Sequence, residues 1–210
     1  MVKKFSLLLV AVGSLLLAAG GYQYFQSEYY QKVSLKEAYE LLSNPIDTIR
    51  QSEELHETNQ AYIVTAAANT NVSFNPSQGE VAGVLAIPAL DAELPIIEGT
   101  NEDELEKGVG HFKASAYPSQ NDQIVLSGHR DTVFRRMGDL TIGDQLIIKM
   151  PYGEFTYVIK ESQIVDAYDT SIIKSTAPQE VLIVSTCYPF SYIGDAPYRY
   201  VLTALPEGKK

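Results

Sequence analysis

Residues 181–189, with the sequence Val-Leu-Ile-Val-Ser-Thr-Cys-Tyr-Pro, restrict the fold more than any other stretch of the chain. Four consecutive branched apolar residues predict a buried strand. Pro189 cannot donate a hydrogen bond to a neighbouring strand, so the strand should stop there. Cys187, the only cysteine among 210 residues, should therefore sit where a rigid strand gives way to a loop. This placement suits a nucleophile, because the strand fixes the backbone while the loop leaves the sulfur accessible.

The composition excludes several classes of function. The net charge of −10, from 16 basic and 26 acidic residues, disfavours binding to nucleic acid, which requires clustered Lys and Arg. A single cysteine forms no internal disulfide, and with only three histidines the chain offers no ligand set for structural zinc. The apolar fraction of 45% is enough for a core, and 14 tyrosines without tryptophan suit a β-rich domain.

The N-terminus carries an export or anchoring signal. Lys3 and Lys4 precede an uncharged, mostly apolar run at residues 5–21, close to the lower limit of about 17 residues for a membrane-spanning helix. Bulky Leu17 weakens the small-residue pattern of a cleavage site, so an uncleaved anchor is favoured over a cleaved signal peptide. The basic residues before the run predict a cytoplasmic N-terminus and an extracellular location for the rest of the chain.

Changes in composition divide the chain into three segments. Residues 1–25 form the cytoplasmic start and the transmembrane signal-anchor. Residues 26–79 form an extracellular stalk, helical where leucines and alanines recur at three- and four-residue spacing and then flexible where Asn, Thr, Ser, Gln and Ala dominate. Residues 80–210 form the folded, catalytic domain. His56 falls in the polar part of the stalk, where we expect it to be exposed and without a role.

The folded domain is predicted to be mainly β, with about eight short strands and little helix. Strands are expected at residues 81–87, 93–97, 124–126, 143–150, 154–165, 181–187 and 198–205. Short helices are expected at residues 101–107 and 132–140. Many short strands separated by turn signals are typical of a small closed β-barrel with short helices on its surface.

Two further residues are candidates for chemistry together with Cys187. His129 ends a short apolar strand and begins a loop, as Cys187 does, so both groups are expected at one rim. Arg199 lies 12 positions after Cys187, on a strand that can return beside the sulfur. A thiolate can attack a carbonyl, an imidazolium can protonate the leaving amine, and a guanidinium can stabilise the oxyanion. The three residues together predict an acyl-transfer site.

Each candidate also has a structural alternative. A lone cysteine in an apolar strand is in most cases a small buried hydrophobe. His111 competes with His129, which we favour because it ends a strand. Arg199 could instead pair with Asp195 on the surface, where such ion pairs contribute little stability.

Ser-Gly-His-Arg-Asp at residues 127–131, followed by Thr186-Cys187 and Arg199, resembles the signature of the sortases, the membrane-anchored cysteine transpeptidases of Gram-positive bacteria. The resemblance extends from about Gly83 to Leu205 in the right order. Ile183-Val184 stand where the family often has Thr-Leu, and both keep the strand apolar. The stretches most similar to class D sortases of bacilli are residues 108–111, 128–134 and 186–189.

The resemblance implies a fold, a site and a reaction. The fold would be the closed eight-stranded sortase β-barrel, with Cys187 as nucleophile, His129 as general acid/base and Arg199 as substrate and oxyanion stabiliser. The substrates would be surface protein precursors with a Leu-Pro-x-Thr-type sorting signal, followed by Ala in class D relatives of bacilli. The enzyme would cleave after Thr through a thioester and transfer the precursor to an amine of peptidoglycan or its lipid-linked precursor.

Neither a cofactor nor a metal is expected. Some sortases hold calcium with acidic residues in the loop before the histidine-bearing strand. In this chain that loop, residues 112–123, has one acid, Asp122, whereas a hard cation needs several oxygens. The acidic residues between 98 and 106 are interpreted as a solvated face or a helix N-terminus. By position alone, residues 114–118 and the loop at 166–173 are candidates for the substrate groove.

Two alternative functions stay open from the sequence. Another exported Cys/His enzyme, such as a cell-wall peptidase or an L,D-transpeptidase-like enzyme, usually carries its cysteine in a Ser-His-Gly-Cys type motif or at a helix start. Neither feature occurs around Cys187. A non-enzymatic, membrane-tethered barrel that binds wall polymer would use Cys187 only for core packing.

Overall fold

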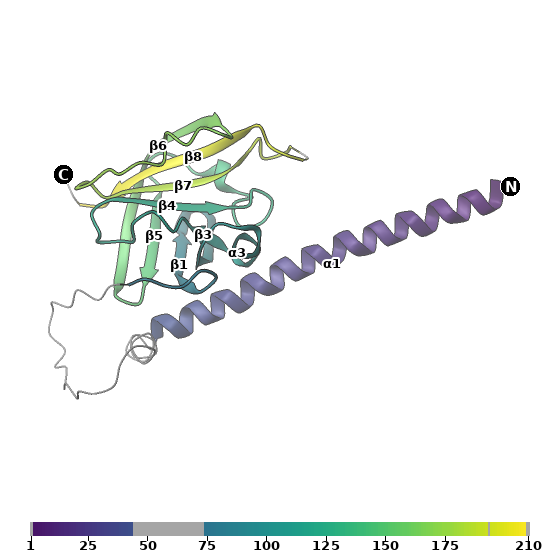
Figure 1. The fold of residues 1–210 in the computed structure, drawn as a ribbon, viewed down its shortest axis with the longest axis horizontal. Helices are drawn as coiled ribbons and strands as arrows, with labels where there is room; N and C mark the ends of the chain where they lie inside the picture. The colour runs from purple at the N-terminus through teal and green to yellow at the C-terminus, as the bar shows by residue number, and fades with distance from the viewer. Residues whose placement is uncertain (1, 44–73, 193, 209–210) are drawn as a thin grey trace.

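The computed structural model describes residues 2–43, 74–192 and 194–208 (Figure 1). A long helix, α1 (Val2–Ser43), projects from a barrel, and the chain's N-terminus lies at the far end of this helix. The C-terminal part of α1 lies against the barrel, where Ser34 and Ala38 are buried. Tyr39 places its ring 5.9 Å from Nζ of Lys149, which also forms an ion pair with Glu93 at 2.8 Å. The helix is therefore fastened to the outside of the barrel near its C-terminal end.

Eight strands close into a barrel in the order β1-β2-β3-β4-β7-β8-β6-β5. The strands are β1 (Val81–Ile87), β2 (Ala92–Glu98), β3 (Val109–His111), β4 (Gln123–Gly128), β5 (Gln145–Met150), β6 (Gly153–Asp166), β7 (Val181–Tyr188) and β8 (Tyr198–Pro206). Short helical elements are α3 (Glu102–Lys107) and the 3-10 turns η1 (Pro88–Leu90) and η2 (Met137–Asp139). The prediction of a mainly β protein with a closed eight-stranded barrel is confirmed.

The apolar run in β7 is buried on both faces of the sheet. Leu182 and Val184 pack into the main core inside the barrel. Val181 and Ile183 belong to a second cluster, which Phe112 and other half-buried residues cover on the outside. A strand covered on both sides needs apolar residues at every position, which explains why this run lacks the alternation of a half-exposed strand.

Two expectations about local structure were wrong. No strand was expected at residues 109–111, but they form β3, a three-residue strand parallel to β2 and antiparallel to β4. A Cβ on Gly110 would lie 2.4 Å from the carbonyl oxygen of Gly99, so close strand packing requires glycine there. The helix expected at residues 132–140 is a series of turns that ends in η2.

The N-terminal predictions fall partly outside the described residues. The apolar run at residues 5–21 lies within α1, and the side chains of several of its residues are not described. Among the described residues, no helix has both the length and the apolar character that crossing a membrane requires. Most of the predicted stalk, residues 44–73 with His56, lies outside the described residues, and β1 begins at Val81.

A buried polar network joins β2 to β3 and to the chain that follows. Glu98 is 3% exposed and accepts hydrogen bonds from His111 Nδ1 and from the Tyr117 hydroxyl, both at 2.6 Å. The other ring nitrogen of His111 lies 3.0 Å from the Ala116 carbonyl oxygen, and its ring stacks on Tyr117. Burial alone raises the pKa of Glu98, but these hydrogen bonds and the nearby positive charge outweigh it, so the pKa lies below its ordinary value.

The acidic residues between 98 and 106 are therefore not one solvated face. Glu98 is part of the buried network, and Glu104 is only 6% exposed. Glu104 accepts a hydrogen bond from the Asn101 backbone N–H at 2.8 Å, which closes a capping box at the start of α3. Glu102, Asp103 and Glu106 are exposed, as expected.

A second contact ties β7 to β4 at the rim of the barrel. Thr186 is 3% exposed, and its hydroxyl donates to the Gly128 carbonyl oxygen at 2.7 Å. Gly128 itself has no room for a side chain, because a Cβ would lie 2.6 Å from Val133 and 2.7 Å from Phe134. The ends of the two parallel strands are thus held together by a side chain as well as by the backbone ladder.

We predict that Glu98→Gln lowers the free energy of unfolding by about 1.5–3 kcal/mol, the usual contribution of hydrogen bonds to a charged group. Because the folded-state pKa is depressed, ionised Glu98 stabilises the fold fully above its unfolded pKa of about 4.3. That contribution is lost as the pH falls through the folded pKa. The difference in free energy of unfolding between wild type and Glu98→Gln should therefore become smaller in acid. Urea unfolding between about pH 7 and about pH 3.5 measures both effects.

The matched control for Glu98 is Glu93→Gln, which removes an exposed carboxylate paired with Lys149. An exposed pair contributes about 0–1 kcal/mol. Equal losses in the two variants, or a gap between Glu98→Gln and wild type that does not change with pH, would contradict the stabilising role of the buried carboxylate.

We predict that Thr186→Val, which keeps the side-chain volume, lowers the free energy of unfolding by about 1 kcal/mol through loss of the bond to Gly128. Thr186→Ser keeps the hydroxyl and should retain the bond, losing only the small contribution of a methyl group. Urea unfolding of both variants at one pH gives the comparison. If Thr186→Val is as stable as wild type, this hydrogen bond does not hold the two strand ends together.

Candidate active site

Three neighbouring strands bring the predicted residues to one rim of the barrel. β4 runs parallel to β7, with Gly128 opposite Thr186, so His129 leaves β4 level with Cys187. β8 returns antiparallel to β7, and its register places Arg199 directly opposite Cys187. Cys187 therefore lies between His129 and Arg199 along the rim, because β7 stands between β4 and β8 in the barrel.

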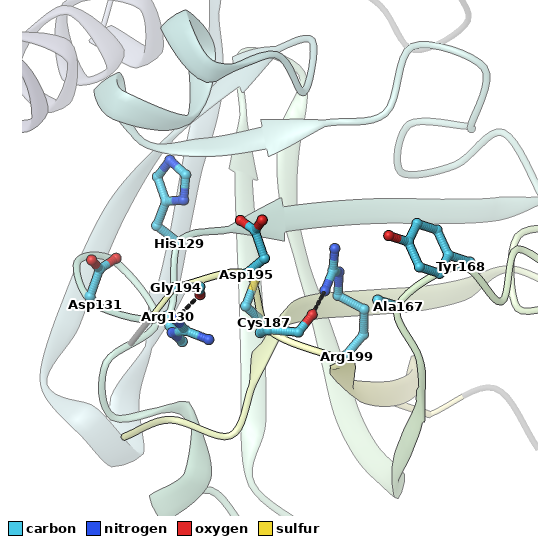
Figure 2. A pocket seen from close by; sticks show the side chains of 10 residues that line it. His129, Arg130, Asp131, Ala167, Tyr168, Cys187, Gly194, Asp195 and Arg199 are labelled. Carbon is cyan, nitrogen blue, oxygen red and sulfur yellow. Dashed lines mark hydrogen bonds between the residues drawn. The ribbon is translucent and has the colours of Figure 1, made fainter. Parts of the chain in front are cut away.

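A cavity of about 350 Å³ opens at this rim (Figure 2). Figure 2 shows His129 and Arg199 on either side of Cys187. The ten residues that line the cavity are His129, Arg130, Asp131, Ala167, Tyr168, Cys187, Gly194, Asp195, Ala196 and Arg199. All three residues predicted for catalysis thus face one cavity.

Cys187 is a free, half-buried thiol near the end of β7. The strand runs one residue further, to Tyr188, and stops before Pro189 as predicted. No hydrogen bond joins the sulfur to another residue that the structure describes. The thiol is therefore held by rigid backbone and stays accessible from the cavity, unlike a cysteine packed into the core.

His129 lies beside a carboxylate from a different element. Its Nε2 is 3.7 Å from Oε1 of Glu102, the first residue of α3. This is an ion-pair distance and too long for a hydrogen bond. The His129 side chain is 28% exposed and that of Glu102 is 76% exposed, so water screens the contact. The imidazole is thus open both to the cavity and to solvent.

Arg199 is held by backbone carbonyl groups. Its Nη1 donates to the Tyr198 carbonyl oxygen at 3.0 Å and to that of Ala196 at 3.3 Å. Nε and Nη2 make no hydrogen bond to the part of the chain that the structure describes, so they are available to a bound oxyanion or carbonyl. The alternative that Arg199 pairs with Asp195 on the surface is not observed, since no ion pair joins them among the described residues.

The competing histidine lies elsewhere. His111 is 1% exposed, and both of its ring nitrogens face oxygen atoms inside the barrel wall. It does not line the cavity. The geometry therefore favours His129 over His111 as the partner of Cys187, in agreement with the choice made from the sequence.

The loop before β4 uses its one acid in a structural role. Asp122 accepts hydrogen bonds from the backbone N–H of Thr176 at 2.6 Å and from the Ser175 hydroxyl at 2.9 Å. Backbone hydrogen bonds from Thr176 and Gln123 are the main cause that lowers the pKa of Asp122. The expectation that the enzyme needs no metal stays a prediction.

The two ranges proposed for the substrate groove differ in outcome. The loop at residues 166–173 contributes Ala167 and Tyr168 to the cavity. Residues 114–118 contribute none, and Tyr117 is buried in the network around Glu98. The place of residues 114–118 in the substrate groove therefore stays a prediction.

Sequence reasoning gave no role to several residues at the site. Arg130 and Asp131 follow His129 in the Gly-His-Arg-Asp stretch, and that adjacency was the available signal. Asp195 was considered only as a surface partner of Arg199. Glu102 was treated as one of several solvated acids, because no local pattern shows that the start of α3 faces the end of β4.

Comparison with known proteins points to one family. The family model described as the sortase domain matches residues 85–207. Sortase D of Bacillus subtilis (strain 168) is 47% identical over 202 residues, which cover 96% of this chain and 97% of that protein. Sortase A of Bacillus anthracis is 22% identical over 98% of this chain and 94% of its own length.

Solved structures show the same fold. A Sortase D5 transpeptidase of Clostridium perfringens has a TM-score of 0.67 and 22% identity, covering 86% of this chain and 99% of that one. A sortase C of Clostridium perfringens, solved with the C-terminal cell wall sorting motif, has a TM-score of 0.59 and 22% identity, covering 83% and 91%. With the family model and the Bacillus subtilis relative, these findings show that the chain belongs to the sortase family of cysteine transpeptidases and is most like the class D sortases.

Proposed function

We propose that the enzyme cleaves a Leu-Pro-x-Thr-type sorting signal after Thr and transfers the new carboxyl end to a peptidoglycan amine. The observation that carries this proposal is the register of β4, β7 and β8, which sets His129, Cys187 and Arg199 side by side around one cavity. Family membership decides against an unrelated wall peptidase and against a non-enzymatic barrel.

In the first half-reaction the Cys187 thiolate attacks the Thr carbonyl carbon and forms a C–S bond. Nε and Nη2 of Arg199 donate to the oxyanion that develops on the carbonyl oxygen. As the C–N bond breaks, the His129 imidazolium gives its proton to the leaving amine. The products are a thioester on Cys187 and the released C-terminal segment of the precursor.

In the second half-reaction an amine of peptidoglycan or of its lipid-linked precursor attacks the thioester carbon. Neutral His129 accepts the proton that the amine loses, so the imidazolium is restored. The C–S bond breaks, and Cys187 leaves as the thiolate. The net change exchanges one amide for another and consumes no cofactor.

The sorting-signal substrate is supported by the relatives. The Clostridium perfringens sortase C that shares this fold was solved with the C-terminal cell wall sorting motif. The 47% identity to Bacillus subtilis Sortase D supports the class D preference for Ala after Thr. In this chain the loop that carries Tyr168 and the wall formed by residues 194–196 are the surfaces against which such a peptide would lie.

We further propose that residues 1–25 anchor the enzyme in the cell membrane, with the N-terminus in the cytoplasm and the barrel outside. The basic start, the uncharged run at residues 5–21 and the match to Sortase D over nearly the whole chain support this topology. An extracellular barrel close to the membrane would meet precursors as they leave it and would lie within reach of the wall.

We predict that the wild-type enzyme forms a covalent adduct with a Leu-Pro-x-Thr-Ala peptide and that Cys187→Ala does not, because no other thiol is present. Intact-protein mass spectrometry detects the thioester, and an added amine should convert it to a transpeptidation product. Peptides with Gly after Thr test the preference at that position. An adduct that persists in Cys187→Ala would sink the assignment of the nucleophile, and no adduct with any peptide in wild type would sink the proposed substrate.

We predict that Arg199→Lys lowers kcat/KM at least about tenfold, although the charge is kept, because one ammonium cannot replace the fixed donors of a guanidinium. Arg136→Lys makes the same change at an exposed position that does not line the cavity, and it should leave turnover unchanged. Steady-state kinetics with the peptide and an amine acceptor gives both values. Near-normal turnover of Arg199→Lys would remove Arg199 from the oxyanion role.

A further inference from the structure

One wall of the active-site cavity belongs to the connection between β7 and β8. We use "the connection" for residues 189–192 and 194–197. Within it, Gly194, Asp195 and Ala196 line the cavity together with Cys187. We call these three residues the wall.

Both ends of the connection are firmly attached to the barrel. At its start, Phe190 packs edge-on against Tyr188 at 5.6 Å and against Tyr200 at 5.4 Å between ring centroids. At its end, the Pro197 carbonyl oxygen accepts a hydrogen bond from the Ala167 N–H at 3.0 Å. These contacts lie outside the wall itself.

Two side chains hold the middle of the connection: Arg199, whose Nη1 donates to the Ala196 carbonyl oxygen at 3.3 Å, and Arg130. Among its described residues, the one backbone hydrogen bond inside the connection runs from Tyr192 N–H to the Pro189 carbonyl oxygen, at 3.2 Å. Arg130 reaches across from the segment after β4, and its Nη2 donates to the Gly194 carbonyl oxygen at 2.9 Å (Figure 2). The guanidinium carbon also lies 5.9 Å from the centroid of the Tyr192 ring, within cation–π range.

Arg130 directly follows His129, so its backbone lies at the rim where the connection passes. Its Nη1 is buried and has no hydrogen-bond partner among the described residues, so the guanidinium gains little at that side. The contacts that fix it are therefore those to Gly194 and Tyr192. The segment that follows His129 thus contacts the wall through Arg130.

We propose that Arg130 is a positioning residue that holds the wall, residues 194–196, against the cavity in the arrangement that receives the substrate peptide. The proposal rests on the proposed function for the identity of that peptide. Cys187 and Arg199 belong to β7 and β8, and His129 directly follows β4, so loss of Arg130 loosens the wall without displacing them. Loss of Arg130 should therefore weaken peptide binding more than it slows the chemical steps.

The first test uses no substrate. In hydrogen exchange followed by mass spectrometry, Arg130→Ala should speed exchange of peptides that cover residues 189–197 by about 3- to 10-fold, the effect of losing one hydrogen bond. Peptides from β1 to β5 should exchange at the wild-type rate. Tyr192→Leu should speed exchange about twofold or more through loss of the ring face, whereas Tyr192→Phe keeps the ring and should keep the slow rate.

The second test separates binding from chemistry. Arg130→Ala should raise KM for a Leu-Pro-x-Thr-Ala peptide by about 3- to 10-fold while kcat changes less than about twofold. Arg130→Lys can keep one bond to Gly194 but not the flat face over Tyr192, so its KM should fall in between. Arg136→Ala is the matched control, because Arg136 also bonds a backbone carbonyl, that of Leu90 at 3.2 Å, and does not line the cavity.

The outcomes distinguish the two proposals. If wild-type enzyme does not turn over any sorting peptide, the proposed substrate fails, while the exchange experiment still decides on Arg130. Unchanged exchange at residues 189–197 in Arg130→Ala would overturn the positioning role. So would a fall in kcat with KM unchanged, because that result would place Arg130 in the chemical steps.

Discussion

The structure depends on the parallel pairing of β4 and β7. Parallel strands start at the same end of the barrel, so the chain that leaves β4 must return to that end before β7 begins. Because β5 and β6 are antiparallel and β6 ends at the rim of Cys187, residues 167–180 make this return. The pairing brings Gly128 and Thr186, 58 positions apart, to the same level at one rim, where the Thr186 hydroxyl locks them. Since Cys187 and His129, the residues proposed for catalysis, follow these two positions directly, sheet register brings them to the same rim.

Much of the barrel could be predicted because its strands carry strong local signals. The branched run in β7 and the proline that follows it gave both the strand and its end. Where the local signal was weak, prediction failed. β3 has three residues, one of them a glycine, and exists only because β2 and β4 pair with it on either side. Phe134, Met137 and Leu140 are buried at a spacing that resembles one face of a helix, yet the segment forms turns and a single 3-10 turn.

The candidate site was predictable to the extent that it lies on strand ends. Arg199 opposite Cys187 follows from an antiparallel return across a short connection, which the spacing along the chain already limits. Glu102 beside His129 could not be inferred, because the contact joins α3 to β4 through the closed barrel and no periodicity encodes it. The same reason explains why Glu98 is buried although other acids at 98–106 are exposed. Its burial depends on His111 and Tyr117, which contact it from other parts of the chain.

The cavity thus combines two kinds of support. Cys187 and Arg199 are fixed by the backbone ladder, which changes only if the barrel changes. The wall at residues 194–196 is fixed by guanidinium groups, from Arg130 at Gly194 and from Arg199 at Ala196. Side-chain contacts of this kind contribute about 1 kcal/mol each and can be exchanged without unfolding the sheet. A barrel built in this way can keep its acyl-transfer geometry while the surface that meets the peptide varies, because the two depend on different interactions.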